Sequence, residues 1–129
     1  MLDNMTTDDP DYELQNLLAL HGAKFNWRDA YELSFRVWEV VRTSQRPHGI
    51  RYALVLRRKA DGAVLVKYDN AHAPQRMGRG YRAWPETHDH RHIGERDGGR
   101  PYRYASPSRL LEDFFADVED IIRAEERKR

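Results

Sequence analysis

The sequence of 129 residues contains no cysteine. The chain can therefore form no disulfide and offers no thiolate nucleophile, and only histidine and carboxylate side chains are left to bind a metal ion. No apolar run approaches the about 20 residues that a membrane-spanning helix needs. The first four residues, Met-Leu-Asp-Asn, lack the basic and apolar regions of a signal peptide. We expect a cytoplasmic protein that does not enter a membrane.

The net charge of +1 conceals a strong separation of charge along the chain. Residues 41–110 hold 15 Lys and Arg against 6 Asp and Glu, whereas the rest of the chain holds 7 against 15. Most of the central cations are arginines, whose planar guanidinium groups bind phosphate bidentately and stack on bases. This pattern favours an RNA-binding surface. The alternative is a solvated face whose cations pair with the acidic ends of the same chain.

Alternation of apolar and polar residues predicts several antiparallel strands. From Tyr31 to Trp38 the period is two, which is typical of a strand with one buried face. The Asp61-Gly62 pair is typical of a hairpin turn between two further strands. The strands that we expect cover residues 31–38, 50–58, 63–68 and 88–93, with a short extended piece at 101–104.

Helical signals near both ends complete the expected fold. Ser106-Pro107 supplies an N-cap and a first-turn proline for a C-terminal helix with one apolar stripe, and Asp9-Pro10 starts a short N-terminal helix. The sequence therefore predicts an α+β fold, a small antiparallel β-sheet of about four to five strands covered by the C-terminal amphipathic helix. We place an N-terminal extension with the short helix at residues 1–25 and a single α+β domain at residues 26–129.

The segment from Ala71 to Thr87 breaks every periodicity. It mixes arginines, among them Arg79 and Arg82, with aromatic residues. This composition suits contact with single-stranded nucleic acid, in which arginines bind phosphates and rings lie under bases. An insertion whose aromatic residues pack on the domain surface would have the same composition. Arg79 and Arg82 are candidate substrate contacts.

Three histidines alternate in the strand expected at residues 88–93. The period of two places His88, His90 and His92 on one face of the sheet. Asp89 and Arg91 then point to the opposite face. A row of imidazoles suits proton transfer near neutral pH, phosphate binding or metal binding.

A metal-independent ribonuclease needs a base for the ribose 2′-hydroxyl, an acid for the leaving oxygen and cations on the phosphate. His90 and His92 are the candidate acid–base pair, and Asp89 or Asp69 is the candidate to orient an imidazole.

Arginines are the candidate phosphate ligands. Arg103 is the better one, because Arg91 points away from the histidines. The further candidate substrate contacts are Tyr68, Asn70, His72 and Tyr102.

Two other interpretations of the histidines stay open. His88, His90 and His92 could hold a transition metal such as zinc, together with Asp69 or Asp89. No second ligand motif with metal spacing is present, so we expect no cofactor. The histidines could also line a solvated face of the sheet and hydrogen-bond nearby polar side chains.

Four segments of the second half, taken together, resemble the TumE family. They are Lys67-Tyr68-Asp69-Asn70, Asp89-His90-Arg91-His92-Ile93-Gly94, Pro101-Tyr102-Arg103-Tyr104, and the helix with Ser108 through Leu111, Asp113-Phe114 and Ala116-Asp117-Val118. Members of this family are assigned as toxins of type II toxin–antitoxin modules. The resemblance implies an activity directed at RNA or translation, and a cognate antitoxin that is typically a helix-turn-helix protein.

The residues and the resemblance lead to one prediction and one alternative. We predict a cytoplasmic toxin that acts on RNA as a ribonuclease by histidine acid–base chemistry, and whose antitoxin covers the basic face. The alternative is a non-catalytic RNA-binding or regulatory protein with the same face. The RNA target does not follow from the sequence, and a homodimer stays open.

Overall fold

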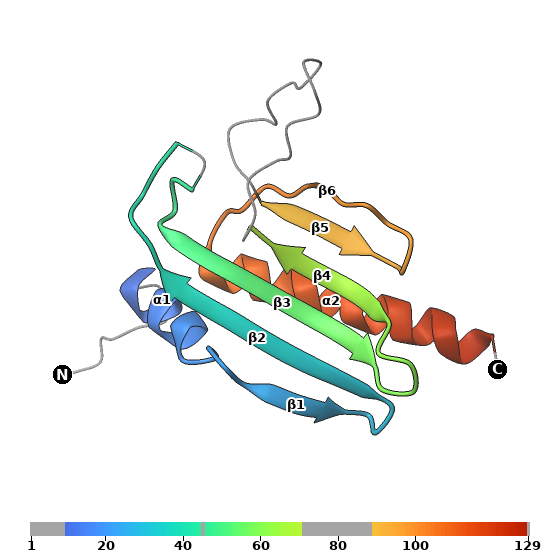
Figure 1. Cartoon of the computed structure of the whole chain (residues 1–129). Coiled ribbons are helices and arrows are strands. Elements are labelled where there is room, and N and C mark those ends of the chain that lie inside the picture. The colour runs from blue at the N-terminus through green and yellow to red at the C-terminus, as the bar shows by residue number, and fades with distance from the viewer. Residues whose placement is uncertain (1–9, 45, 71–88, 129) are drawn as a thin grey trace, which may run out of the picture.

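A computed structural model of the chain describes residues 10–44, 46–70 and 89–128. Its elements are helix α1 (Pro10–Leu18), strands β1 (Lys24–Trp27), β2 (Tyr31–Glu39), β3 (Ile50–Arg58), β4 (Val64–Asp69), β5 (His90–Ile93) and β6 (Arg100–Pro101), and helix α2 (Pro107–Arg127). The strands form one antiparallel sheet in the order β1 to β6. Helix α2 crosses one face of the sheet, and α1 contacts α2 and β2 (Figure 1). The predicted α+β fold is confirmed.

The sheet has six strands rather than four or five. The additional edge strand, β1, spans only four residues, which is too short for its periodicity to stand out. Its turn into β2 also carries no glycine: Arg28 and Asp29 take positive φ values of 50° and 62°, a conformation that glycine usually marks. At the other edge, β6 has two residues.

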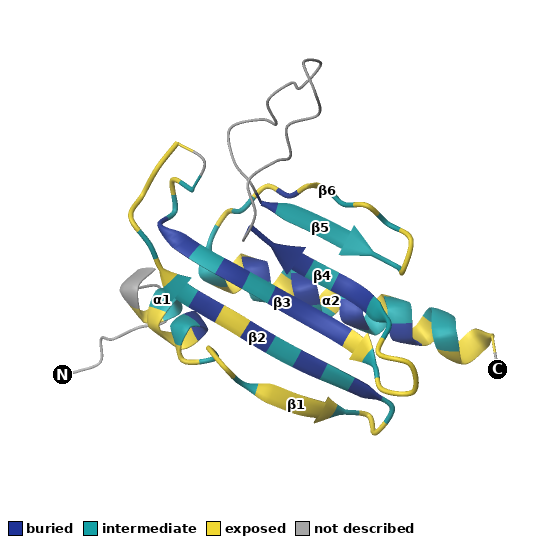
Figure 2. Cartoon of the chain, viewed as in Figure 1, coloured by how far each residue is buried: buried dark blue, intermediate teal, exposed yellow. Residues whose placement is uncertain are grey.

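The core lies between the sheet and α2. Every second residue of β2 is at most 2% exposed, from Tyr31 to Val37. Helix α2 contributes a stripe four residues apart, all 0% exposed: Leu110, Phe114, Val118 and Ile122. Ser106 caps this helix as the sequence predicts, since its hydroxyl accepts the Arg109 N–H at 3.1 Å. Figure 2 shows the buried residues alternating along β2.

Tyrosine hydroxyls attach α2 to the sheet. They donate to three carboxylates of the helix, in the pairs Tyr102–Asp113 at 2.7 Å, Tyr68–Asp117, and Tyr31–Glu125 at 3.0 Å. Burial raises the pKa of Tyr68 and of Tyr102, and the neighbouring carboxylates raise it further. The hydroxyls therefore stay protonated and act as donors. Among the described residues, no helix is both long and apolar enough to cross a membrane.

Candidate functional site on the open face of the sheet

The face of the sheet turned away from α2, here called the open face, carries both described histidines of β5. Two rows of directly paired residues cross it from β2 to β5. One row is Arg36, Ala53, Asp69 and His90, and the next is Ser34, Val55, Lys67 and His92. Directly opposed residues in an antiparallel sheet point to the same side. His90 and His92 therefore share one surface with Asp69 and Lys67, as the period of two predicts for the histidines.

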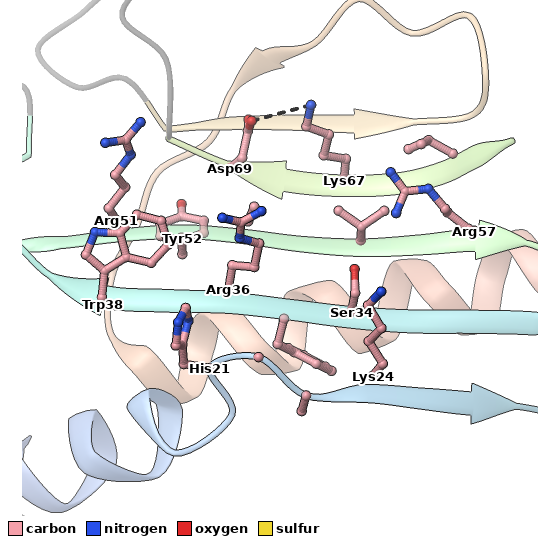
Figure 3. Close-up of a pocket in the computed structure, with 16 residues that line it drawn as sticks. His21, Lys24, Ser34, Arg36, Trp38, Arg51, Tyr52, Arg57, Lys67 and Asp69 are labelled. Atoms are coloured by element: carbon pink, nitrogen blue, oxygen red, sulfur yellow. Dashed lines mark ion pairs between the residues drawn. The ribbon is translucent and has the colours of Figure 1, made fainter. Parts of the chain in front are cut away.

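Asp69 lies between two basic side chains. Its Oδ2 is 3.5 Å from Nζ of Lys67, a pair drawn in Figure 3, and its Oδ1 is 3.9 Å from Nε2 of His92. The residue is 5% exposed, so little water screens these interactions. The strands thus bring together an imidazole, a carboxylate and an ammonium group, which suits proton transfer next to a phosphate.

The turn after β5 orients His92. Nδ1 of His92 lies 3.2 Å from the carbonyl oxygen of Asp97, and a carbonyl only accepts, so Nδ1 carries the hydrogen and Nε2 faces Asp69. The Asp97 carboxylate accepts the backbone N–H groups of Ile93 at 2.9 Å and Gly99 at 2.8 Å. These hydrogen bonds lower the pKa of Asp97 to about 2.

Arg91 lies on the opposite face, against α2. Its Nε donates to Oδ2 of Asp117 at 3.0 Å, and its guanidinium carbon is 5.9 Å from the ring centroid of Tyr68. These contacts make Arg91 part of the attachment of α2 to the sheet. Arg103 follows β6 and is exposed.

Asp89 also lies away from the open face and is 1% exposed. Its Oδ2 accepts the Tyr52 hydroxyl at 2.6 Å and lies 3.0 Å from Nε2 of His48. Nδ1 of His48 accepts the Ile50 N–H at 3.3 Å, so Nε2 is the donor to Asp89. Burial raises the pKa of Tyr52, and the charge of Asp89 raises it further. Asp89 therefore orients an imidazole, but that of His48.

Sequence reasoning missed His48. It stands 41 residues before Asp89, in a Pro-His-Gly stretch that is typical of an exposed turn, yet its side chain is only 9% exposed. Its ring packs on Tyr104, with the centroids 4.2 Å apart. Nothing in the local sequence indicates this contact.

Three other predicted contact residues are buried and hydrogen-bonded within the protein. Asn70 is 0% exposed, accepts the Tyr52 N–H at 2.9 Å and donates to the Ile50 carbonyl at 2.9 Å. Tyr68 and Tyr102 are held by the carboxylates of α2. The remaining candidates, His72, Arg79, Arg82 and His88, lie outside the described residues.

A hollow of about 660 Å³ opens on this face beside Asp69 (Figure 3). Ser34, Ala53 and Val55 are among its lining residues. Its lining contains five Lys and Arg residues against one carboxylate, that of Asp69; the cations are Lys24, Arg36, Arg51, Arg57 and Lys67. We call this hollow the basic basin. An anionic ligand fits it electrostatically.

The basin was also missed as a unit in the sequence. The local sign of the basin is in β2, where Ser34, Arg36 and Trp38 alternate with the buried residues. That half shows which residues share a face, but the pairing with β3 and β4 is needed to show that they form a hollow.

Comparison with known families decides the assignment. A family model described as Toxin TumE matches residues 11–122. The chain belongs to the TumE family. No curated protein and no solved structure matches it. As a TumE-family protein, the chain is a component of a toxin module, and the family implies an antitoxin as its partner.

In the described part of this TumE-family chain, no three His, Asp or Glu side chains lie close enough together to hold a metal ion. The zinc alternative included His88, which lies outside that part. The expectation of no cofactor and the zinc alternative are therefore both untested by the described residues.

Proposed function

We propose that this TumE-family toxin cleaves RNA by metal-independent acid–base chemistry at His90 and His92. The observation that carries the proposal is the placement of both histidines with Asp69 and Lys67 on the open face, beside the basic basin. Titratable groups that cluster beside a cationic hollow favour a functional site over a structural role.

In the proposed reaction the ribose 2′-oxygen attacks the adjacent phosphorus. His92 removes the proton of the 2′-hydroxyl, and His90 gives a proton to the departing 5′-oxygen. The bond between phosphorus and the 5′-oxygen breaks as the bond to the 2′-oxygen forms, which leaves a 2′,3′-cyclic phosphate and a 5′-hydroxyl end. Lys67 stabilises the negative charge that develops on the phosphate.

The position of Nε2 supports His92 as the base. Because Nδ1 donates to the Asp97 carbonyl, the lone pair of the neutral ring is on Nε2, next to Asp69. Asp69 stabilises the imidazolium that forms after proton transfer. Arg103, exposed after β6, is the predicted second cation for the phosphate.

Cleavage of a single-stranded RNA by the purified protein, in buffer with EDTA, tests the proposal. We expect His90→Ala and His92→Ala each to reduce the rate about 10²- to 10⁴-fold, with unchanged thermal melting and with cyclic phosphate ends on the wild-type products. Arg123→Gln, on the exposed side of α2, is the control and should cleave like the wild type. Cleavage that both histidine variants retain, or that EDTA abolishes, would overturn the proposal.

Induced expression in cells connects the chemistry to toxicity. We expect growth arrest with new RNA cleavage for the wild-type chain, and loss of both in the His90→Ala/His92→Ala variant. Arrest that persists in the variant would place the toxic site elsewhere.

A non-catalytic RNA-binding protein is the second candidate, and the basic basin favours it independently of the histidines. It predicts RNA binding with no cleavage under any condition that keeps the protein folded. Binding and cleavage assays on the same preparation separate the two functions.

For the partner, we propose a helix-turn-helix antitoxin that neutralises the toxin in the cytoplasm by covering the open face. Mixing the purified antitoxin with the toxin should then prevent both RNA binding and cleavage. Arg36→Glu reverses a charge of the basin and should weaken the complex, whereas Arg123→Glu should not. An antitoxin that binds with equal affinity to both variants would locate its interface elsewhere.

A further inference from the structure

We infer that the basic basin holds single-stranded RNA with one unstacked base on Trp38 and neighbouring phosphates on the arginines around it. This inference rests on the proposed function and adds to it a base-binding subsite away from the histidines. Its starting point is the position of Trp38 on the open face rather than in the core.

Trp38 is surrounded by cationic and aromatic side chains. It pairs with Arg51 across the sheet, and the guanidinium carbons of Arg36 and Arg51 lie 5.9 and 5.6 Å from its ring centroid. The imidazole of His21 meets the ring edge-on, at 5.5 Å between centroids and 72° between planes. Figure 3 shows these four residues together at one end of the basin. The group offers planar surfaces and positive charge at a single place.

These two properties match a nucleotide of a single strand. Bases stack on aromatic rings and on guanidinium planes, and arginine also binds phosphate. In a duplex both faces of each base are covered by its neighbours, so only an unpaired, splayed base can stack on Trp38 or on the arginines beside it. With one carboxylate against five Lys and Arg in its lining, the basin favours a polyanion over an acidic peptide, whose charges are fewer and less closely spaced.

The sheet register sets the relation of this subsite to the histidines. Arg36 on β2 and His90 on β5 belong to the same cross-strand row, so about 14 Å separates their backbones at the usual spacing of strands. The path between them crosses the short side chains of Ala53 and Val55 on β3 and then passes Asp69 and Lys67 on β4. An RNA segment with a base on Trp38 can therefore cross β3 and β4 and place a later phosphate at His90 and His92. Trp38 binds the substrate but does not touch the reacting atoms.

The test measures binding without cleavage. A labelled oligouridylate with 2′-O-methyl riboses lacks the nucleophilic hydroxyl, and its binding to the full-length protein is followed by fluorescence anisotropy. Loss of one stacked base weakens binding by about 5- to 150-fold, so we expect this effect from Trp38→Leu. Trp38→Phe keeps an aromatic ring and should restore most of the affinity. Arg123→Gln serves as the control, and thermal melting verifies that every variant is folded.

The outcomes separate this inference from the proposed function. Trp38→Leu binding the oligonucleotide as tightly as the wild type would overturn the subsite. A matched 2′-O-methyl duplex that binds as tightly as the single strand would overturn it as well. Basin variants that weaken the antitoxin complex but bind RNA like the wild type would also overturn the subsite, because the basin would then be a protein interface. Trp38-dependent binding in a protein that never cleaves RNA would support the subsite while the ribonuclease proposal fails.

Discussion

At the residue scale, His92 depends on a glycine that is seven positions away in the chain. Gly99 has a φ of +103°, and a Cβ built on it would lie 2.5 Å from Cε1 of His92. The imidazole thus fills the space that any other residue at position 99 would need. Together with the Asp97 carbonyl, this contact determines where the Nε2 atom of His92 points.

Gly99→Ala is expected to displace the His92 ring and to abolish most RNA cleavage. The positive φ itself also destabilises the fold, by about 1 to 3 kcal/mol for a residue other than glycine. Gly94→Ala is the matched control, because Gly94 has a φ of +95° and nothing within 4 Å of its Cβ position. Both variants should lose similar stability in urea unfolding, but only Gly99→Ala should lose activity. Equal activity of the two would show that the position of His92 does not matter.

Asp97 should make the stability of the fold depend on acidity. Its folded-state pKa of about 2 lies below the unfolded value of about 3.9. Its contribution to stability is therefore complete above about pH 4 and is lost as the pH falls toward 2. Urea unfolding of the wild type and Asp97→Asn over this range should give curves that converge at low pH. Asp120→Asn, at an exposed position of α2, removes a carboxylate charge elsewhere and is the control. A stability difference between the wild type and Asp97→Asn that stays the same at every pH would contradict the lowered pKa of Asp97.

Asp89 is expected to act on stability through His48 and Tyr52. Asp89→Ala leaves the Tyr52 hydroxyl and Nε2 of His48 without their acceptor, and each buried donor left unsatisfied costs about 1 to 3 kcal/mol. Tyr52→Phe removes one hydrogen bond and should cost about 1 kcal/mol. Chemical denaturation measures both. A fully stable Asp89→Ala protein that has lost cleavage would instead return Asp89 to the catalytic group.

At the element scale, α2 combines an apolar stripe with a line of carboxylates toward the sheet. The stripe alone would let the helix slide along the sheet, since hydrophobic contact is not directional. The bonds of Asp113, Asp117 and Glu125 to three tyrosines select one position, and the positions of those tyrosines are determined by the strands. The carboxylates on this side of α2 are therefore part of the fold rather than only a solvated surface.

Asp117→Ala tests this role of the helix. It leaves Arg91 and the Tyr68 hydroxyl without their carboxylate, and an unsatisfied buried group costs about 1 to 3 kcal/mol. Glu112→Ala, at an exposed position of the same helix, should change stability by less than about 0.5 kcal/mol. Urea midpoints measure the difference, and equal midpoints would show that the carboxylate is dispensable.

At the scale of the whole molecule, the cations have both of the roles that the sequence analysis left open. Some pair with acidic residues of the same chain, and others form a basic surface. Cations of residues 41–110 pair with acidic residues of α2, as in Arg58–Glu125 at 2.5 Å and Arg91–Asp117 at 3.0 Å. On the open face, five cations line the basin against one carboxylate. The described cations therefore include one group that pairs with carboxylates of α2 and another that lines the basin.

The dependence of RNA affinity on salt concentration should show how many phosphates the basic basin contacts. For single strands the slope of log K against log salt is about −0.7 per phosphate contacted. Arg36→Gln and Arg57→Gln should each reduce its magnitude by about 0.7, and Arg123→Gln should leave it unchanged. Titrations of the 2′-O-methyl oligouridylate at several salt concentrations measure the slope. An unchanged slope in the basin variants would mean that RNA binds elsewhere.

The sequence by itself determined the elements with clear periodicity. The alternation in β2, the turn at Asp61-Gly62, the capped stripe of α2 and the shared face of His90 and His92 all follow from local geometry. The edge strand β1 escaped, because it is short and its turn carries positive φ at Arg28 and Asp29.

Only the tertiary structure decided which polar groups meet. His48 reaches Asp89 across 41 positions, Asp69 lies between Lys67 and His92, and four strands contribute the arginines and lysines of the basin. Periodicity gives the face on which a side chain lies, because it depends on the dihedral angles of one segment. The partner on that face depends on strand register and on the packing of distant segments, which no local pattern encodes.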